Sequence, residues 1–264
     1  MELVYPTVTA AARAMFRALD LRITVEGDEH VPTSGPVVLA ATHGSFLDFA
    51  LVGLAARRSR RRVRFLTRYD VWRTPLVGPF MDAMRHVPVD RTAPAAAYLT
   101  ARSMLRAGEA VGVFPEAGVS TSYTVRPLMP GAVALARATG APLLPVAIWG
   151  PQRILSAGVP PDLHRGRPVS LRVGEPLDVR PGEDARAGTT RLGATLQGLL
   201  EDLQRRPVHR PRPGELAHWH PAHLGGAAPT PEQAARRESV PPSAVPVSWG
   251  PAAAATAAAW GRGG

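Results

Sequence analysis

Hydrophobic and polar positions follow two different periods along residues 1–206 of the chain. Short apolar runs that end in polar or glycine residues predict buried strands over 36–43, 63–68, 86–91, 110–116, 142–150 and 168–177. Apolar residues at helical spacing predict helices over 7–19, 45–58, 75–84, 93–109, 130–140 and 184–206. Because strands and helices alternate, we expect an α/β fold with a largely parallel central sheet and helices on both faces. Pro145 indicates that its strand lies near a sheet edge, or that the proline lies near the strand start.

The same patterns divide the chain into three parts. Residues 1–25 are expected to hold an amphipathic helix, which either packs on the core or lies on a lipid surface with its arginines near the headgroups. Residues 26–206 form the expected catalytic domain. From Pro207 onward proline, glycine and alanine dominate and no period survives, so 207–264 is expected to be a disordered tail.

The composition limits which catalytic and ligand-binding groups the protein can use. There are no cysteines, which excludes disulfides, thiolate metal sites and a cysteine nucleophile. The formal charge is +10 and every basic residue other than histidine is arginine, so a phosphate held by a cationic side chain would be held by arginine. No apolar run is long enough to span a bilayer, and no signal peptide is evident.

The segment THGSFLD, residues 42–48, carries the first candidate chemistry. On one continuous helix His43 and Asp48 would point about 140° apart, since each residue turns about 100°. If His43 instead closes a strand and a helix begins near Ser45, the turn brings the carboxylate to the ring. Such a pair suits general-base catalysis, because the carboxylate fixes the tautomer and stabilises the imidazolium.

A structural interpretation of this segment stays open. Ser45 and Asp48 also have the spacing of a helix capping box, and His43 could be an ordinary strand-end residue. The sequence has no G-x-S-x-G nucleophile elbow, which favours direct attack by a substrate hydroxyl with His43 as base. Backbone N–H groups near Gly44 and Ser45 are candidate oxyanion donors.

Four segments in order resemble the motifs of the 1-acylglycerol-3-phosphate acyltransferases, the PlsC-like glycerolipid acyltransferases. THGSFLD resembles N-H-x-x-x-x-D, GPFMDAMRHVPVDR resembles a second motif that ends in arginine, FPEAGVS resembles F-P-E-G-T-R-S, and LLPVAIWG resembles a fourth apolar strand with proline. The match spans roughly residues 36 to 175. Each motif alone is weak, but their shared order is specific.

This resemblance implies a function and a site. The catalytic pair would be His43 and Asp48, and no metal or organic cofactor is expected. The donor would be acyl-CoA or acyl-carrier protein, and the acceptor a lysophospholipid, foremost 1-acyl-sn-glycerol-3-phosphate. The substrate-binding residues implied are Ser45, Arg91, Phe114, Pro115, Glu116, Gly118, Ser120 and Arg126.

The third motif departs from the family pattern. Ala117 stands where the family has glycine, and Val119 stands where it has arginine. Arg126 is a candidate replacement for that missing cation. The departure supports an alternative hypothesis, in which the acceptor is another lipid such as a glycolipid or an amino-acid lipid.

Six arginines lie within residues 56–64 and predict a basic surface. An anionic membrane or an acidic carrier protein would suit it, which places the protein peripherally on the cytoplasmic face of the membrane. Nucleic-acid binding is a competing hypothesis that the scarce aromatic residues disfavour, and an inactive scaffold is disfavoured by the intact His43 and Asp48. The histidines of HWHPAH lack nearby carboxylates, which disfavours a metal site.

Overall fold

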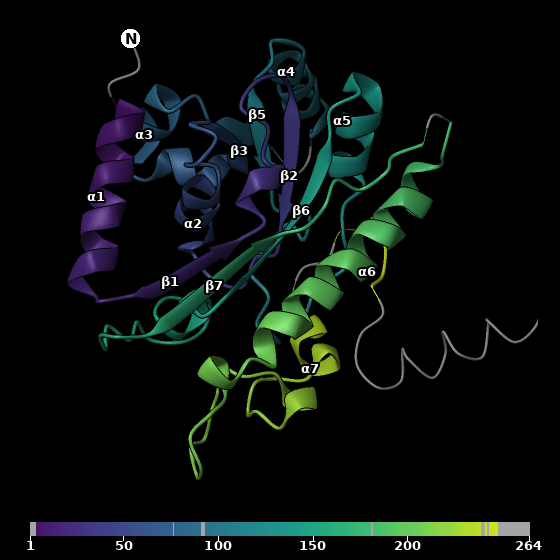
Figure 1. The fold of residues 1–264 in the computed structure, drawn as a ribbon. Helices are drawn as coiled ribbons and strands as arrows, with labels where there is room; N and C mark the ends of the chain where they lie inside the picture. Colours follow the sequence, from purple (N-terminus) through teal and green to yellow (C-terminus); the bar gives the residue numbers. More distant parts are fainter. Residues whose placement is uncertain are drawn as a thin grey trace, which may run out of the picture.

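The computed structural model describes residues 4–75, 77–90, 93–180, 182–238, 241 and 243–247, and Figure 1 shows its fold. Within these residues, seven strands form one sheet in the order β1-β7-β6-β2-β5-β3-β4. Their bounds are β1 Arg22–Glu26, β2 Val37–Ala41, β3 Val63–Arg68, β4 Val87–Val89, β5 Ala110–Val113, β6 Leu143–Trp149 and β7 Pro168–Val173. Neighbouring strands are parallel except for β6 and β7, which pair antiparallel. The predicted α/β fold with a largely parallel sheet is confirmed.

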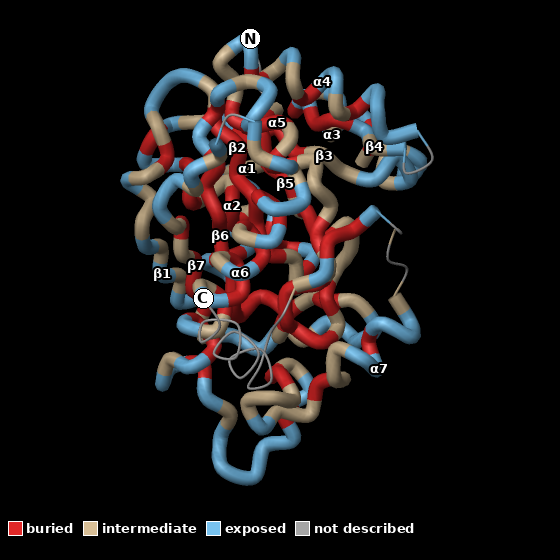
Figure 2. Tube along the Cα trace, turned by 90° about the vertical axis from the view of Figure 1, so that its right-hand side faces the viewer, coloured by how far each residue is buried: buried red, intermediate tan, exposed pale blue. Residues whose placement is uncertain are grey.

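Helices cover both faces of this sheet. Their bounds are α1 Val4–Ala18, α2 Asp48–Ala55, α3 Val77–Ala83, α4 Ala95–Arg106, α5 Gly131–Thr139, α6 Ala185–Gln204 and α7 Pro231–Ala235. Apolar residues of α4, α5 and α6 pack on one face, and those of α1 and α2 pack on the other. Strands β2, β5 and β6 are buried along their whole length (Figure 2), as expected of parallel strands covered on both sides.

Two strands differ from expectation. Strand β1 was missed because it is a half-exposed edge strand whose alternating burial lacks a continuous apolar run. It pairs with β7, so the expected division at residue 25 falls inside a strand. Of the two positions predicted for Pro145, the sheet edge is wrong because β6 is central, and the position near the strand start is confirmed. The missing N–H of Pro145 is tolerated at the third residue of β6, since the β7 ladder begins only at Val146.

The sheet topology creates a crevice between β2 and β5. These two strands are neighbours, yet the chain leaves β2 through α2 toward β3 and leaves β5 through α5 toward β6. The two helices lie on opposite faces, so the chain turns to opposite sides of the sheet after the loops that follow β2 and β5. Open α/β sheets bind ligands at such a point. His43 and Glu116 follow these two strands.

The segment after α6 is ordered against the domain over its described residues. The guanidinium of Arg153 stacks on the Trp219 ring at 3.2 Å, and Leu128 forms an antiparallel bridge with Val245. His209 is fully buried, with Nε2 2.9 Å from the Ser170 hydroxyl. The predicted disorder from residue 207 is therefore wrong for the described part of 207–247, and residues 248–264 of the expected tail lie outside the described residues. Individual side-chain contacts hold the described part of this proline-rich segment, and it contains no long helix or strand. Its sequence therefore shows no hydrophobic periodicity.

Helix α1 packs on the core. Phe16 is buried among residues of the α2 face, and the Tyr5 hydroxyl accepts a hydrogen bond from the Val63 N–H at 2.9 Å. Arg17 and Arg22 are exposed. Among the described residues, none of the helices combines the length and the apolar composition that crossing a membrane requires.

Candidate active site

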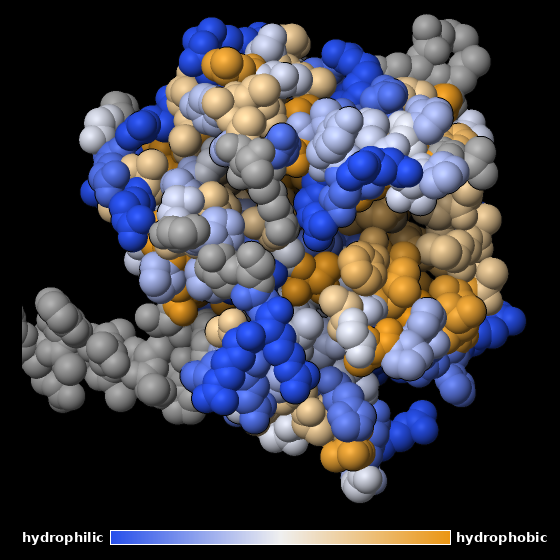
Figure 3. Space-filling model, turned by 180° about the vertical axis from the view of Figure 1, so that it is seen from behind, coloured by the Kyte–Doolittle hydropathy of each residue, from blue (hydrophilic) through white to orange (hydrophobic). Residues whose placement is uncertain are grey.

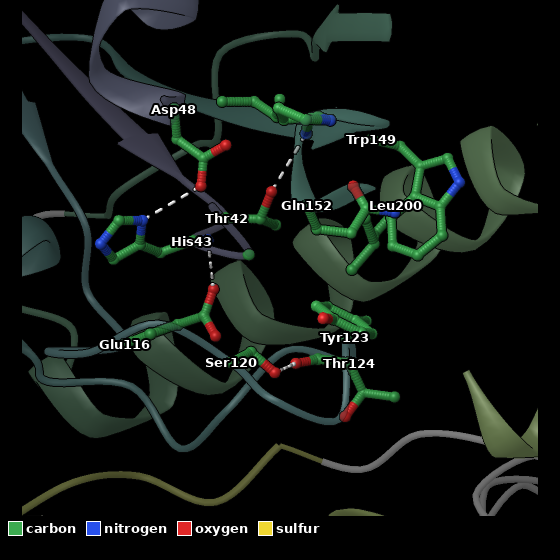
Figure 4. Close-up of a pocket in the computed structure, with 13 residues that line it drawn as sticks. Thr42, His43, Asp48, Glu116, Ser120, Tyr123, Thr124, Trp149, Gln152 and Leu200 are labelled. Atoms are coloured by element: carbon green, nitrogen blue, oxygen red, sulfur yellow. Dashed lines mark hydrogen bonds and ion pairs between the residues drawn. The ribbon is translucent and has the colours of Figure 1, made fainter. Parts of the chain in front are cut away.

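His43 and Asp48 meet across the junction between β2 and α2, as the sequence predicts. Strand β2 ends at Ala41 and α2 begins at Asp48, so the intervening loop turns the imidazole back over the start of the helix. The Nδ1 atom of His43 lies 3.0 Å from Oδ2 of Asp48. In Figure 4 the second ring nitrogen, Nε2, points away from the carboxylate. This geometry leaves one nitrogen to exchange protons while the other is held.

Asp48 is buried, and its carboxylate organises the loop as well as the ring. The same Oδ2 atom accepts a hydrogen bond from the Ser45 N–H at 2.8 Å. Burial raises the pKa of Asp48, and the hydrogen bonds from His43 and from the backbone N–H groups of Ser45 and Gly44 oppose that rise. The predicted oxyanion role of the Gly44 and Ser45 N–H groups is therefore wrong, because both N–H groups face Asp48.

Ser45 lies in the loop, fully buried. Its hydroxyl donates to the Leu155 carbonyl at 2.6 Å and accepts from the Leu47 N–H. The Ser156 hydroxyl donates to the Gly44 carbonyl at 2.7 Å. Two hydrogen bonds therefore hold the loop after β6 against the His43 loop. The Ser45 hydroxyl makes both of its hydrogen bonds to groups of the protein.

An aromatic stack supports the imidazole. The His43 ring lies against Phe114 with ring centroids 4.2 Å apart, and Phe114 stacks on Phe65 at 5.7 Å. The His43 side chain is 19% exposed. Packing on one side and Asp48 at the edge restrict the ring to one orientation.

Glu116 joins the two loops of the crevice. One carboxylate oxygen accepts from the His43 N–H at 2.8 Å, and the other accepts from the Arg126 N–H at 3.0 Å. Burial raises the pKa of Glu116 to about 8, opposed by these two hydrogen bonds. Both oxygens are engaged, so the structure places Glu116 as a brace between the loops. Pro115 is buried beside it.

Arg126 lies over the third motif. Its Nε atom is 2.8 Å from Oε2 of Glu238, and its guanidinium occupies the space that a Cβ on Gly118 would take. Ser120 is buried and its N–H donates to the His43 carbonyl at 2.7 Å. The structure thus brings Gly118, Ser120 and Arg126 together near His43. Arg91 lies outside the described residues.

The cavity beside His43 is small. It has a volume of about 10 Å³, room for about one water molecule. Figure 4 shows the polar residues Thr42, Ser120 and Thr124 in its wall, with Trp149 and Leu200 closing the far side. A cavity of this size does not hold an acyl chain.

The arginine run lies at the opposite end of the sheet. It precedes β3, which is parallel to β5, so it belongs to the amino-terminal edge and not to the edge of His43. Arg64 is buried with its Nη1 donating to the Met84 carbonyl, and Arg61 donates to the carbonyls of Pro32 and Gly108. The predicted single basic patch of six arginines is wrong, because two of them are bound within the fold.

Several residues around the site escaped the sequence patterns. Thr121 and Glu238 contact each other at the third motif, and Leu155 and Ser156 hold the His43 loop. These contacts are long-range and involve loops, which leave no periodic signal. Among the described residues, no group of three or more histidine or acidic side chains is arranged to hold a metal ion.

A buried carboxylate that contacts one nitrogen of a histidine, with the other nitrogen directed outward, has the geometry expected of enzymes that use a histidine base on a hydroxyl. The comparisons identify the family within that class. The model of the family described as Acyltransferase matches residues 22–149. A 1-acyl-sn-glycerol-3-phosphate acyltransferase of Bacillus subtilis is 32% identical over 143 residues, which cover 53% of this chain and 70% of the relative. The chain belongs to the PlsC-like acyltransferase family and is an acyltransferase.

Two further comparisons extend this assignment. A chloroplastic 1-acyl-sn-glycerol-3-phosphate acyltransferase of Brassica napus is 28% identical over 147 residues, covering 54% of this chain and 41% of the relative. The chain thus spans less than half the length of this plant relative. The crystal structure of PlsC from Thermotoga maritima matches with a TM-score of 0.62 and 23% identity, over 76% of this chain and 81% of that chain. That likeness bears on the fold alone.

Proposed function

We propose that this acyltransferase moves a fatty acyl group from an acyl thioester to the hydroxyl of a lysophospholipid, foremost 1-acyl-sn-glycerol-3-phosphate, giving phosphatidic acid. The observation that carries the proposal is the contact of His43 Nδ1 with buried Asp48 at 3.0 Å, with Nε2 directed away. The names of the Bacillus and Brassica relatives support the acceptor. The donor is acyl-CoA or acyl-carrier protein.

The proposed mechanism uses the His43 imidazole as base. Nε2 takes the proton of the acceptor hydroxyl as its oxygen attacks the thioester carbonyl carbon. Asp48 stabilises the resulting imidazolium through Nδ1. The tetrahedral intermediate then collapses, the carbon–sulfur bond breaks, and the thiolate receives the proton from Nε2. The products are the ester and the free thiol.

Replacing His43→Ala tests the proposal. We expect acyl transfer to fall by about 10³-fold or more, because no other described group takes the proton at that position. The measurement follows labelled acyl-CoA into lipid products separated by thin-layer chromatography. Unchanged thermal unfolding would show that the fold is retained.

His164→Ala is the matched control for this substitution. His164 also contacts an aspartate, with Nδ1 2.5 Å from Oδ1 of Asp162, but it is 86% exposed and lies outside the site. We expect normal transfer from this variant. Near-normal transfer by His43→Ala would refute the proposed role of the imidazole.

A second candidate function keeps the chemistry and changes the acceptor to a glycolipid or an amino-acid lipid. The specific observation behind it is that Val119 replaces the motif arginine and that Arg126 is paired with Glu238. A panel of acceptors with and without a phosphomonoester, offered with acyl-CoA and acyl-carrier protein, separates the two. Preference for an acceptor without that phosphate would favour this alternative.

A further inference from the structure

The carboxylate of Glu238, from the segment after α6, lies in a ring of donors at the third motif. One oxygen accepts from the Thr121 N–H at 3.0 Å and from the Thr121 hydroxyl at 2.8 Å. The other oxygen is 2.8 Å from Arg126 Nε. The side chains of Arg126 and Glu238 are 6% and 10% exposed. An anionic group is therefore nearly buried here. An amide and a hydroxyl hold it by hydrogen bonds, and the Arg126 guanidinium holds it as an ion pair, because its Nε–H is not directed at the carboxylate.

This donor set suits a phosphomonoester as well as a carboxylate. Arginine, backbone N–H and hydroxyl donors all bind phosphate oxygens, and the charged pairing strengthens each hydrogen bond. Gly118 makes room for the guanidinium, since a Cβ at this position would lie 2.2 Å from Nη1 of Arg126. The site is thus built by the local sequence of the third motif and filled by a distant residue.

The donors connect directly to the catalytic loop. Arg126 donates its N–H to Glu116, and the other oxygen of Glu116 holds the His43 N–H. Ser120, the neighbour of Thr121, donates its N–H to the His43 carbonyl. An anion in this position therefore has a fixed relation to the imidazole, as the acidic head group of an acceptor requires.

The chain on the amino-terminal side of Glu238 forms a strap that is held by its own contacts. We define the strap as residues 230–238. Thr230 and Gln233 form a capping box at the start of α7, and Ala234 is buried. Beyond the strap, Val245 exchanges two backbone hydrogen bonds with Leu128. These contacts hold the chain on both sides of Glu238 in place, and none of them involves the Glu238 carboxylate or the Arg126 guanidinium.

We propose that Arg126 and Thr121 form a subsite for a phosphomonoester dianion and that Glu238 occupies it as an internal competitor. The strap must release Glu238 before such an anion binds. The proposal rests on the proposed function only in naming the acceptor's phosphate as the natural occupant. In this arrangement Arg126 provides the cation that the third motif lacks at Val119. The strap controls whether a phosphomonoester can reach that cation.

Glu238→Gln tests the competition, because it removes the charge and keeps the size. The probes are inorganic phosphate and sn-glycerol 3-phosphate, titrated calorimetrically into the purified full-length chain at constant ionic strength. We expect both to bind about fivefold tighter or more than to the unmodified chain, since the competent state is more populated. Equal or weaker binding would overturn the proposal.

Two further variants test whether the gain in phosphate affinity arises at Glu238 and Arg126. Glu232→Gln removes an exposed carboxylate from the same strap and should bind phosphate like the unmodified chain. Adding Arg126→Gln to Glu238→Gln should abolish the gain, because the guanidinium is the cation of the subsite. A gain that survives without Arg126, or that Glu232→Gln reproduces, would contradict the assigned subsite.

A measurement on the unmodified chain covers the case in which Glu238→Gln unfolds. Hydrogen–deuterium exchange over the strap should become faster in saturating phosphate, because the displaced carboxylate no longer holds it. Slower or unchanged exchange would count against displacement.

Kinetics separate this proposal from the proposed function. With 1-acyl-sn-glycerol-3-phosphate, Glu238→Gln should lower KM and leave kcat unchanged. A raised KM would mean that Glu238 positions Arg126 for the acceptor and would overturn competition. Tighter phosphate binding without transfer to any lysophospholipid would support the subsite and refute the proposed acceptor.

Discussion

At the scale of the residue, one oxygen of Asp48 performs two tasks. It accepts hydrogen bonds from the His43 ring and from the Ser45 N–H, so the orientation of the imidazole and the conformation of its loop depend on the same atom. The predicted capping box of Ser45 and Asp48 is not formed, because the N-cap of α2 is Leu47 and no side chain caps this helix. The Asp48 carboxylate instead turns back to the Ser45 N–H. The helix start provides a buried carboxylate, and the strand end provides a ring within its reach.

Ala117 carries local backbone strain beside this pair. Its φ is +53°, in the left-handed region that disfavours side chains with a Cβ. The family motif has glycine at the same position. The bend is needed because Phe114 to Glu116 must leave β5 and direct the Glu116 carboxylate toward the His43 N–H.

Ala117→Gly should stabilise the fold. Relief of the left-handed strain exceeds the added entropy of the unfolded chain by roughly 0.5–1 kcal/mol. The measurement is the free energy of unfolding in urea. Ala107→Gly is the control, because Ala107 is exposed with φ −81° and should lose stability instead. A loss of stability in Ala117→Gly would show that the strain is not relieved.

At the scale of the element, the segment after α6 completes the domain through a buried histidine. His209 is fully buried against Ser170 of β7, which also accepts a hydrogen bond from the Thr24 hydroxyl of β1. Burial, helped by the positive charges of Arg153 and Arg206, lowers the pKa of His209 to about 3. The packing of this segment on β7 therefore requires the neutral imidazole.

This requirement gives a pH dependence with a defined sign. The folded pKa is about 3 and the unfolded pKa about 6.5, so below pH 6.5 the unfolded state binds the proton and stability falls as the pH falls. Relative to His209→Gln, the unmodified chain should lose about 1.4 kcal/mol per pH unit between about pH 6.5 and about pH 5. Urea unfolding at several pH values measures this difference.

The comparison with a variant is necessary because other buried groups act in the opposite direction. Burial raises the pKa of Glu116, so its contribution favours the folded state as the pH falls toward 4.5. Subtracting the His209→Gln curve removes such shared contributions. His218→Gln, at an exposed histidine of the same segment, should leave the curve unchanged. A parallel pair of curves for His209→Gln and the unmodified chain would refute the buried neutral imidazole.

Elements with a strong period were predictable from sequence, and those held by long-range contacts were not. The buried runs of β2, β5 and β6 have no polar interruptions, which fixed their type and the position of His43. Edge strand β1 is half-exposed and gave no such run. Glu238 and Arg126 are separated by more than a hundred residues, and pairing over that distance has no local signature.

At the scale of the whole molecule, charge and apolar surface lie at different edges of the sheet. The exposed arginines before β3 belong to the amino-terminal edge. Phe46, which lies in the loop between His43 and Asp48, and Phe49, which follows Asp48, are 48% and 43% exposed. Figure 3 shows apolar side chains gathered, beside a hollow, on the half of the rear face that corresponds to the α1–α3 side of Figure 1. We propose that a lipid surface is met through aromatic side chains at the active-site edge.

The double substitution Phe46→Ser and Phe49→Ser should weaken vesicle binding by about tenfold, through loss of buried apolar area. Arg57→Gln with Arg60→Gln, at the opposite edge, should weaken it less at moderate salt. Cosedimentation with vesicles containing anionic lipid measures both. The reverse order of effects would place the arginine edge against the membrane.

The Glu116 brace has a consequence for how this enzyme can change its substrate. Because one carboxylate ties the His43 backbone to the Arg126 backbone, the base and the cation beside the third motif are set at one separation. For the proposed acceptor, this separation would set the distance between the hydroxyl at His43 and the phosphate at Arg126. An acceptor of another size would then need a different loop over 117–125 with the same Glu116 brace.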